Sequence, residues 1–520
     1  MPDAHPVPPV DAARLASTVP TTADRQQRTV RAPATDEKLG TVPDCRPADV
    51  DAAVERARTA QQAWADRTIA DRVAVLRDVH DAVLDRQQEL VDTLQAETGK
   101  ARGDAAEEVL DIANNARYYA DTAEQCLSPS SRSGVVPGVT RAVEHCHPKG
   151  VVGIVTPWNY PLTLAVSDAL PALVAGNAVV VKPAEGTPYS TILAAEILRE
   201  SGVPEDCFQV VTGEGTALGE PLIEAVDMLT FTGSTATGRT VAELAGRHLT
   251  ETSLELGGKN PAVVLDDADI ERTATGIVRD SFANAGQLCV SIERVYVAES
   301  VYHDVRDAVV ERTDDLTVGV GRDWALDVGS LQSATQLAKV SEHVEDARER
   351  GATVLAGGEH RPDIGPYVYE PTVLADVPED ARLVDEETFG PVVRLEPVAD
   401  AGAAVAAAND SAYGLHGAVW TGDTDRGADL AARIDCGTVA VNDTYRAMWS
   451  SMDAPMGGRG DSGIGRRHGR QGIEKYTDAQ SVVSQRGPAL RPEWLPDKYW
   501  IGAVTGYSRL RNTASQWLPR

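Results

Sequence analysis

The feature that most constrains the fold of this chain is a regular alternation of short apolar runs and helical stretches after about residue 150. The apolar runs lie at 150–155, 178–181, 208–211, 228–231 and 253–256. Stretches with helical periodicity separate them, at 162–175, 188–201, 216–225 and 234–246. Buried strands that alternate with crossover helices form parallel, doubly wound sheets. The sequence therefore predicts an α/β fold.

A second α/β region runs from about 259 to 455, and a helical region precedes the first. The second region has apolar runs at 261–265, 294–298, 353–356, 392–397 and 437–442, and helical stretches at 268–285, 300–316, 335–350 and 400–408. Apolar spacing predicts N-terminal helices at 50–64, 72–97 and 105–123, with Asp49 and Asp104 as N-caps. An exposed strand excursion is expected at 127–148 and a further strand at 478–486.

The chain is strongly acidic, with a formal net charge of −29 from 78 acidic and 49 basic residues. A field of this sign repels nucleic acid and anionic membranes, so neither is expected as a partner. Eight of the basic residues are Lys and 41 are Arg. An acidic, Lys-poor surface suits a halophilic cytoplasm, where molar salt shortens the Debye length to about 3 Å. A GC-rich genome also explains the excess of Arg.

Cysteine spacing and apolar content exclude several classes of protein. The six cysteines, at 45, 126, 146, 207, 289 and 436, form no Cys-x-x-Cys pair, so no metal site or disulfide framework is expected. The first 20 residues are rich in Pro without an apolar core, and no apolar run reaches the ~18 residues that span a bilayer. We expect a soluble, cytoplasmic protein without a signal peptide.

Three residues offer the chemistry of a nucleophile, a base and an oxyanion donor. Cys289 lies in a Gly-containing turn; a lone Cys is usually a small buried hydrophobe, but its thiolate is a strong nucleophile. Glu255 lies between two Leu at a strand end, where desolvation would make it a better base, unless it is a solvated edge residue. Asn159 follows the first strand, where its amide either forms an Asx-turn or stabilises an oxyanion.

Two further segments suit a dinucleotide. Lys182 and Glu185 follow the second strand, and an acidic group at such a strand end accepts hydrogen bonds from ribose hydroxyls. Residues 231–238 run from a strand through a Gly turn into a helix, whose N-terminus offers N–H groups to a pyrophosphate. The ordinary Rossmann fingerprint is absent, because no Gly-x-Gly-x-x-Gly follows the first strand.

Together these segments resemble the aldehyde dehydrogenase superfamily, over about residues 30–487. The matching motifs, in the family's order, are TPWNYP (156–161), VKPAE (181–185), FTGSTATG (231–238), LELGGKNP (254–261), GQLC (286–289) and EETFGPV (386–392). The 34 residues from Glu255 to Cys289 match the family's usual spacing. The resemblance implies a Rossmann-type dinucleotide-binding domain, an α/β catalytic domain and a small β oligomerisation excursion that pairs subunits into homodimers or homotetramers.

The expected boundaries are an N-terminal arm at 1–25, the dinucleotide-binding domain at 26–126 and 149–258, the catalytic domain at 259–457, oligomerisation segments at 127–148 and 458–490, and a C-terminal tail at 491–520.

The resemblance also implies a role for each site residue. Cys289 attacks the aldehyde carbon, Asn159 and the Cys289 backbone N–H stabilise the oxyanion, and Glu255 activates the water that hydrolyses the thioester. Lys182 and Glu185 bind the adenine ribose. The full set expected to bind the dinucleotide is Thr156, Pro157, Trp158, Lys182, Glu185, Gly233, Ser234, Glu387 and Phe389. NAD is the expected cofactor, because the Glu185 carboxylate repels the 2′-phosphate of NADP; use of NADP stays possible.

Segments 281–294, 454–458 and 461–469 resemble actinobacterial succinate-semialdehyde dehydrogenases, so succinate semialdehyde is the leading substrate. Enzymes of that kind carry an Arg six residues before the nucleophile and another eight residues after the catalytic Asn, where this chain has Ala283 and Ser167. Because no guanidinium stands there, the alternative substrate is an uncharged aliphatic or aromatic aldehyde.

Other functions on the same fold are possible. A catalytically idle structural relative would lack the nucleophile or the base, and both are present. An enzyme that passes the acyl group to coenzyme A generally lacks the deacylating Glu, so Glu255 favours hydrolysis. The tail at 491–520 holds three of the eight Trp and is net positive, so we expect it to dock on its own or a neighbouring subunit.

Overall fold

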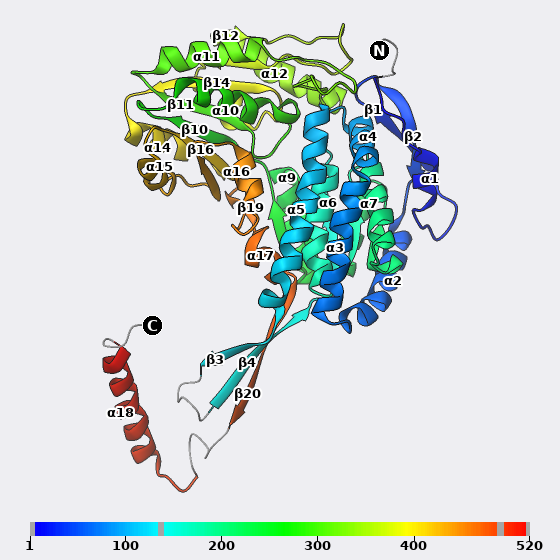
Figure 1. Ribbon diagram of the computed structural model, residues 1–520, viewed down its shortest axis with the longest axis vertical. Coiled ribbons are helices and arrows are strands. Elements are labelled where there is room, and N and C mark those ends of the chain that lie inside the picture. Colours follow the sequence, from blue (N-terminus) through cyan, green and yellow to red (C-terminus); the bar gives the residue numbers. More distant parts are fainter. Residues whose placement is uncertain (1–5, 134–139, 486–492, 516–520) are drawn as a thin grey trace. The chain divides into compact units, whose positions relative to one another are not determined.

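The computed structural model describes residues 6–133, 140–485 and 493–515 (Figure 1). Its contacts divide the chain into two units, one formed by 1–126 with 148–478 and the other by 127–147 with 479–520. The first unit contains two large sheets and every residue of the expected site.

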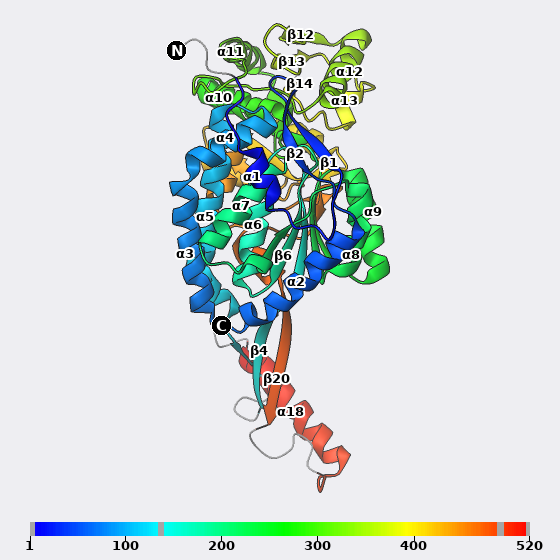
Figure 2. The same ribbon diagram turned by 90° about the vertical axis from the view of Figure 1, so that its right-hand side faces the viewer.

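The first large sheet has the doubly wound arrangement that the apolar runs predict. Its order is β19–β9–β8–β5–β6–β7, with β5 Val151–Val155, β6 Ala178–Lys182, β7 Phe208–Val210, β8 Met228–Thr232 and β9 Glu251–Glu255 parallel and β19 Gly463–Ile464 antiparallel. Helices α2 (Pro47–Ala65), α8 (Gly215–Ala225) and α9 (Thr235–His248) cover one face, and α6 (Pro161–Val174) and α7 (Tyr189–Glu200) cover the other (Figure 2). Helices α3 (Ile69–Asp85), α4 (Gln87–Thr98) and α5 (Arg102–Leu127) pack outside α6 and α7 (Figure 2).

Two buried carboxylates of the outer helices hold the N-termini of α6 and α7. Glu108 of α5 accepts hydrogen bonds from the backbone N–H groups of Leu162 (3.1 Å) and Thr163 (3.0 Å). Glu97 of α4 accepts in the same way from the first two residues of α7, at 2.7 and 2.9 Å. Such N–H groups have no partner inside their own helix, and the helix dipole favours a negative charge there. Glu108 thereby fixes the loop that leads from β5 into α6.

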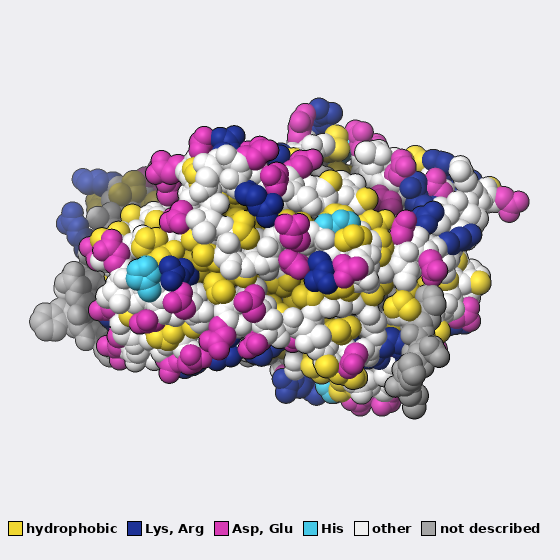
Figure 3. All heavy atoms as spheres, turned by 90° about the horizontal axis from the view of Figure 1, so that it is seen from above, with side chains coloured by type: hydrophobic (Ala, Val, Ile, Leu, Met, Phe, Trp, Pro, Cys, Tyr) yellow, Lys and Arg dark blue, Asp and Glu magenta, His cyan; other side chains and the backbone are white. Residues whose placement is uncertain are grey.

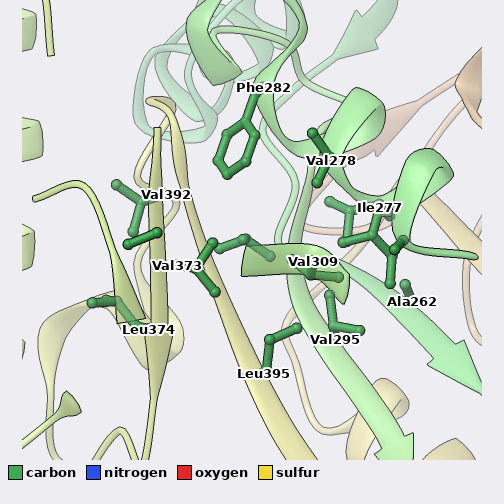
Figure 4. Packing of buried hydrophobic residues seen from close by; sticks show 14 of the residues in the cluster. Ala262, Ile277, Val278, Phe282, Val295, Val309, Val373, Leu374, Val392 and Leu395 are labelled. Carbon is green, nitrogen blue, oxygen red and sulfur yellow. The ribbon is translucent and has the colours of Figure 1, made fainter. Parts of the chain in front are cut away.

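The second large sheet has seven strands in the order β12–β13–β14–β11–β10–β16–β17, and all but β12 are parallel. The strands are β10 Asn260–Val264, β11 Ile292–Ala298, β12 Thr353–Ala356, β13 Thr372–Ala375, β14 Val392–Val398, β16 His416–Trp420 and β17 Thr438–Val441. Helices α10 (Ile270–Phe282) and α11 (Tyr302–Asp314) pack Phe282 and Val309 against Val295, Val373 and Leu395 of the sheet (Figure 4). The other helices of this region are α12 (Ala334–Arg350), α13 (Arg382–Asp385), α14 (Ala401–Asn409), α15 (Thr424–Ala431), α16 (Tyr445–Ser450) and α17 (Gly469–Glu474).

The other unit contains a three-stranded sheet and one helix. The sheet order is β20–β4–β3, with β3 Ser130–Ser133, β4 Thr140–Pro148 and β20 Thr477–Gln485, and β3 and β4 are antiparallel. These strands lie where the sequence predicts an excursion and a further strand. Helix α18 spans Asp497–Ser515.

The N-terminal region differs from three expectations. Residues 6–25, expected to be a loose arm, contain helix α1 (Ala12–Ser17), whose Leu15 is 1% exposed. The helix expected at 72–97 is interrupted at Arg86, which separates α3 from α4. The strands β1 (Gln27–Ala32) and β2 (Glu37–Pro43) form a hairpin that the apolar pattern does not predict.

Neither expected aspartate is an N-cap. Helix α2 begins earlier, at Pro47, which suits the first helical position. Asp49 is therefore its third residue, and its carboxylate accepts from the backbone N–H of Arg46 at 2.8 Å. Asp104 lies inside the first turn of α5, and its carboxylate accepts from the backbone N–H of Asn284 at 2.9 Å.

The surface mixes the two signs of charge. On the face shown in Figure 3, acidic side chains are widespread, with Lys and Arg side chains among them. Arg86, for example, lies within 2.9 Å of the carboxylates of Glu89, Glu196 and Glu200. Among the described residues, no helix is both long and apolar enough to cross a membrane.

Candidate active site

Cys289 lies in a tight turn between α10 and β11. Asn284, Ala285 and Gly286 have φ values of 51°, 54° and 69°, a left-handed conformation that Gly and Asn adopt most readily. A Cβ atom at Gly286 would lie 2.0 Å from the carbonyl oxygen of Gly390, so only Gly fits this approach. The turn places Cys289 on the wall of a cavity.

Buried side chains hold the main chain on both sides of Cys289. Asn260, the first residue of β10, donates from Nδ2 to the carbonyl oxygens of Cys289 (2.8 Å) and Ser291 (2.7 Å). On the other side, Asp104 accepts from the backbone N–H of Asn284. The nucleophile candidate is therefore fixed by contacts to a neighbouring strand and to α5.

Asn159 lies in the loop between β5 and α6, directly beside the Cys289 turn. Its Nδ2 donates to the carbonyl oxygen of Gln287 at 2.9 Å, and its Oδ1 accepts no hydrogen bond among the described residues. The backbone carbonyl of Asn159 accepts from Lys100 Nζ at 2.7 Å, and Lys100 also lies 2.5 Å from Glu108. The Asn159 amide is thus bonded to Gln287, which precedes the candidate nucleophile Cys289 by two residues.

A cavity of about 210 Å³ brings eight of the twelve expected site residues together. These are Pro157, Trp158, Asn159, Gly233, Ser234, Cys289, Glu387 and Phe389. The remaining lining residues, which the sequence analysis did not single out, are Leu164, Thr232, Leu256, Gly257, Gln336 and Lys339. The other four expected residues, Thr156, Lys182, Glu185 and Glu255, do not line this cavity.

The loop that carries Glu387 and Phe389 is anchored by a buried ion pair. Glu293 of β11 accepts from the backbone N–H groups of Thr388 (2.9 Å) and Phe389 (3.0 Å) and pairs with Lys259. Glu387 Oε1 accepts from the backbone N–H of Gly258 at 2.8 Å. Burial raises the pKa of Glu387 to about 7, and the nearby Glu293 carboxylate adds to this effect. The loop therefore presents to the cavity a carboxyl group that is held on one side by the backbone of Gly258.

Lys182 and Glu185 form a pair at the carboxyl end of β6. Lys182 Nζ lies 3.0 Å from Glu185 Oε1, and the same oxygen accepts from the backbone N–H of Gly215, the first residue of α8, at 2.8 Å. Burial raises the pKa of Glu185, but the Lys182 charge and these hydrogen bonds outweigh it, so the net pKa is lowered. Glu185 is therefore ionised at neutral pH.

Glu255 and Cys289 both have raised pKa values. Glu255 is the last residue of β9 and is 4% exposed, and burial raises its pKa to about 8. Burial also raises the pKa of the Cys289 thiol to about 12, and the carboxylates of Glu255 and Glu387 raise it further. The thiol is therefore protonated at neutral pH and needs a proton acceptor before it can attack.

Comparison with known proteins identifies the family. The sequence pattern described as "Aldehyde dehydrogenase family" matches residues 20–482. The chain belongs to the aldehyde dehydrogenase family. A protein of Mycolicibacterium smegmatis, provisionally named an NADP(+)-dependent succinate-semialdehyde dehydrogenase, is 47% identical over 482 residues, which cover 92% of this chain and 93% of the relative. A Sinorhizobium fredii protein with a similarly provisional name is 37% identical over 88% of this chain and 93% of its own.

Solved structures have the same aldehyde dehydrogenase fold. An "NADP dependent enzyme" of E. coli matches with a TM-score of 0.87 at 33% identity, over 92% of this chain and 100% of that chain. An NAD+ complex of an aldehyde dehydrogenase from Bacillus cereus matches with a TM-score of 0.84 at 33% identity, over 89% and 94%. Both the fold prediction and the family resemblance are thereby confirmed, and this aldehyde dehydrogenase is an NAD(P)-dependent enzyme.

The residues of this aldehyde dehydrogenase fit a dinucleotide. Ser234 caps α9, so the N-terminus of a 14-residue helix opens at the cavity wall where a pyrophosphate would bind. Gly257 lets the Glu387 carboxyl group approach the main chain, because a Cβ atom at this position would lie 2.8 Å from Glu387 Oε2. The rings of Trp158 and Phe389 meet edge to face at 5.5 Å on the same wall.

On another side, Cys289 of this aldehyde dehydrogenase packs against an apolar, aromatic cluster. Its members are Tyr160, Leu164, Ala283, Leu288, Val290, Leu415, Tyr445 and Met456, with Met448 and Trp449 at the margin. Trp449 meets the rings of Tyr160 and Tyr445 at 5.4 and 5.1 Å. Ala283 belongs to this cluster, and Ser167 donates instead to Asp111 at 2.8 Å. The side chains of this cluster carry no charge, and Lys100 and Arg446 lie against the rings of Tyr160 and Tyr445 at 3.8 and 6.0 Å.

Several positioning residues of this aldehyde dehydrogenase were missed from the sequence. Lys259, Asn260 and Glu293 are polar residues within or beside apolar runs, and that pattern is the signal that could have found them. Lys100, between α4 and α5, and Glu108, in α5, lie far from any motif in the sequence. Among the described residues, no group of three or more His, Cys, Asp and Glu is placed to hold a metal ion.

Proposed function

We propose that this enzyme oxidises its aldehyde to a carboxylic acid through a thioester on Cys289. The supporting observation is the single cavity whose wall includes the Cys289 side chain, the Asn159 amide and the Glu387 carboxyl group. A nucleophile, an oxyanion donor and a ribose-binding group within one space are the elements that the reaction needs.

The proposed chemistry begins when the Cys289 thiol releases its proton to a solvent water molecule and the sulfur adds to the aldehyde carbon. The Asn159 side-chain amide and the Cys289 backbone N–H stabilise the resulting oxyanion. When bound, the dinucleotide supplies the acceptor for the hydride of that carbon, which leaves a thioester on Cys289. Glu255 then takes a proton from a water molecule as the water oxygen adds to the thioester carbon. The C–S bond breaks, the acid leaves, and the sulfur is free for another cycle.

The dinucleotide site in this proposal consists of residues of both large sheets. Thr156, Pro157, Trp158, Gly233 and Ser234 lie along the pyrophosphate. Lys182 and Glu185 bind the adenine ribose, and Glu387 and Phe389 bind the nicotinamide ribose and ring. The region at 26–126 and 149–258 then acts as the dinucleotide-binding domain, and 259–457 as the catalytic domain.

Succinate semialdehyde is the proposed substrate, and the names of relatives at 45–47% identity support it. The uncharged cluster around Cys289 favours a second candidate, an aliphatic or aromatic aldehyde without a carboxylate. The two differ in one measurement, kcat/KM for succinate semialdehyde against butanal, which has the same number of carbon atoms. A higher kcat/KM for butanal contradicts the first assignment.

Two variants test the mechanism itself. Cys289→Ala is expected to abolish oxidation while dinucleotide binding survives, so turnover in this variant contradicts the thioester. Glu255→Gln is expected to slow deacylation about 100-fold or more, the scale of a lost general base. A burst of about one NADH per site should then precede a slow steady state. An unchanged steady-state rate would show that another base serves.

A further inference from the structure

The Glu255 carboxylate has an unusual environment for a group that must carry a charge. Neither of its oxygens accepts a hydrogen bond from the described residues. Its neighbours Leu254 and Leu256 are buried, and a Cβ atom at Gly457 would lie 3.1 Å from Glu255 Oε1. A buried carboxylate without hydrogen-bond donors ionises only where a cation lies close by.

Two buried cations lie beside this end of β9. The main chain of Arg467 pairs in both directions with Met456, the residue next to Gly457, at N···O distances of 2.6 and 2.8 Å. Arg467 is 5% exposed, and its Nη2 forms no hydrogen bond among the described residues. Lys475 Nζ donates at 3.3 Å to Ser253 Oγ, on the same strand as Glu255. Both cations therefore belong to the segments that pack on β9.

The third member of this group is Asp168 of α6. Its Oδ1 lies 3.2 Å from Lys475 Nζ and its Oδ2 lies 3.3 Å from Arg467 Nη2, and Tyr476 donates its hydroxyl to Oδ1 at 3.2 Å. Two cations and one carboxylate leave one positive charge, which equals the charge of an ionised Glu255. The four side chains thus form a neutral buried set only when Glu255 is ionised.

The pKa directions agree with this count. Burial raises the pKa of Glu255 to about 8, Arg467, Lys475 and Arg466 lower it, and Asp168 raises it. Burial lowers the pKa of Arg467, but Asp168 and Glu255 outweigh it, so the guanidinium stays charged. Burial also lowers the pKa of Lys475, and the charge of Asp168 opposes this. Two further charged groups act on the set with opposite signs: Asp111, whose pKa burial raises to about 6, acts on Arg467, and Arg466 acts on Glu255. His468 is neutral, its pKa lowered by burial to about 3, and the Cys289 thiol is protonated.

We infer that Arg467, assisted by Lys475, is a positioning residue whose charge favours the ionised form of Glu255 at the end of β9, the form that takes a proton from the deacylating water. This inference rests on the proposed function of Glu255 as the base. Without Arg467, the uncompensated carboxyl group should hold its proton to a higher pH. Deacylation should then fail at neutral pH and recover in alkaline solution.

The test is the pH profile of the steady-state rate and of the NADH burst in Arg467→Gln, measured with saturating aldehyde. The acid limb of the steady-state rate should move to higher pH by at least about one unit, so that the rate at a given pH on this limb falls roughly tenfold. A burst of about one NADH per site should remain. Arg467→Lys should restore most of the wild-type profile, because it returns the charge. An unchanged acid limb in Arg467→Gln overturns the inference.

Three further variants separate this inference from other causes. Asp168→Asn removes the anion that competes with Glu255 for the two cations, so the acid limb of its steady-state rate should move to lower pH. If Arg467→Gln does not fold, the profiles of Asp168→Asn and Arg467→Lys test the inference instead. Arg72→Gln removes a buried guanidinium that donates to backbone carbonyls of Val174 and Arg67, and its acid limb should stay in place whatever its stability. If Glu255→Gln keeps its steady-state rate, the proposed base fails. If Glu255→Gln is slow but the Arg467 profile is normal, only this inference fails.

Discussion

The Cys289 thiol shows how single charges set the reactivity of this site. Its raised pKa has burial as the first cause and the charges of Glu255 and Glu387 as the next, and Arg467 lowers it. The base that deacylation needs therefore works against formation of the thiolate. The two groups titrate as a coupled pair, because each charge disfavours the other.

This coupling predicts the effect of Glu255→Gln on the nucleophile. Removal of the carboxylate removes a charge that raises the pKa of Cys289, so thiolate should form at lower pH, by about one unit. The measurement is the pH dependence of iodoacetamide alkylation, followed by mass spectrometry on the peptide that carries Cys289. Cys146, which is also partly exposed, provides an internal control whose profile should not change. A midpoint for Cys289 that moves upward would contradict the coupling.

We expect Glu185 to decide a second property of the site, the choice between NAD and NADP. Its Oε1 is held by Lys182 and the backbone N–H of Gly215, so the carboxylate is fixed near the start of α8. A 2′-phosphate carries roughly −1.5 to −2 charges, so a carboxylate within hydrogen-bond distance of the ribose repels it, whereas a 2′-hydroxyl donates a hydrogen bond to that carboxylate. We predict NAD over NADP by at least about tenfold in kcat/KM, or ~1.4 kcal/mol.

The check on Glu185 is a measurement of both constants at high and low salt. Glu185→Gln should raise kcat/KM for NADP and reduce the preference. Glu205→Gln, on the exposed 3₁₀ turn Glu205–Cys207, removes the same charge elsewhere and should leave the preference unchanged. A preference for NADP in both salt conditions would refute Glu185 as the residue that reads the ribose, and would agree with the NADP(+) in the names of the relatives.

At the scale of elements, the Lys259–Glu293 pair ties β10 and β11 to the 386–390 loop. Glu293→Gln leaves the Lys259 charge buried without its partner, which should lower the free energy of unfolding by about 3–5 kcal/mol. It should also weaken dinucleotide binding, because the N–H groups of Thr388 and Phe389 lose their charged acceptor. Urea unfolding and a titration with NADH measure the two effects.

The matched control for this pair removes both charges. In Lys259→Met with Glu293→Leu, no uncompensated charge remains, so part of the lost stability should return. The affinity for dinucleotide should stay low, because the loop still has no acceptor. Full recovery of the affinity in the double variant would show that the loop does not depend on Glu293.

The elements differ in how far the sequence predicts them. Parallel strands such as β5 and β8 are apolar runs bounded by turns, so they were predicted within one or two residues. The break at Arg86 was not, because the apolar pattern continues through it and only the backbone changes direction. Strand β16 was missed because His416–Trp420 is short and contains a Gly.

The candidate site shows the same division. Cys289, Glu255 and Asn159 could be predicted as site residues because motifs mark them. Arg467 and Asp168 were not, because they are 299 positions apart in the sequence and only the fold brings them within 3.3 Å of each other. Charge pairs of this kind leave no local pattern, so a single sequence cannot predict which polar residues of a buried element are partners.

At the scale of the whole molecule, the charge of −29 predicts a dependence on salt. Self-repulsion among 78 acidic and 49 basic residues opposes the folded state, and molar salt screens it. We predict that the melting temperature rises by roughly 5 °C between 0.1 and 2 M KCl, which for a chain of 520 residues corresponds to about 5 kcal/mol. At about pH 5, where carboxylates begin to take up protons, the rise should be smaller. A melting temperature that falls with KCl at pH 7 would contradict the idea of a halophilic surface.

Helix α18 has the composition of a surface that another chain covers. In the single chain, Leu510 is 71% exposed, Tyr499 63%, and Ile501 and Val504 54% and 43%; Trp494, which precedes the helix, is 80% exposed. Within Asp497–Ser515, three basic residues face one acidic residue, while the chain as a whole is acidic. Apolar side chains on a basic helix are therefore complementary to the acidic surface of a second copy.

We predict that this helix docks on a neighbouring subunit of a homodimer or homotetramer. A chain that ends at residue 490 should form smaller assemblies than the full chain, as measured by light scattering after gel filtration. Ile501→Asp with Val504→Asp should have the same effect, because these positions lie on one side of the helix and two added charges would be buried without partners. Thr513→Asp adds a charge on another side and should keep the full assembly. An unchanged mass for the shortened chain would show that strands β3, β4 and β20, or other surfaces, hold the subunits together without α18.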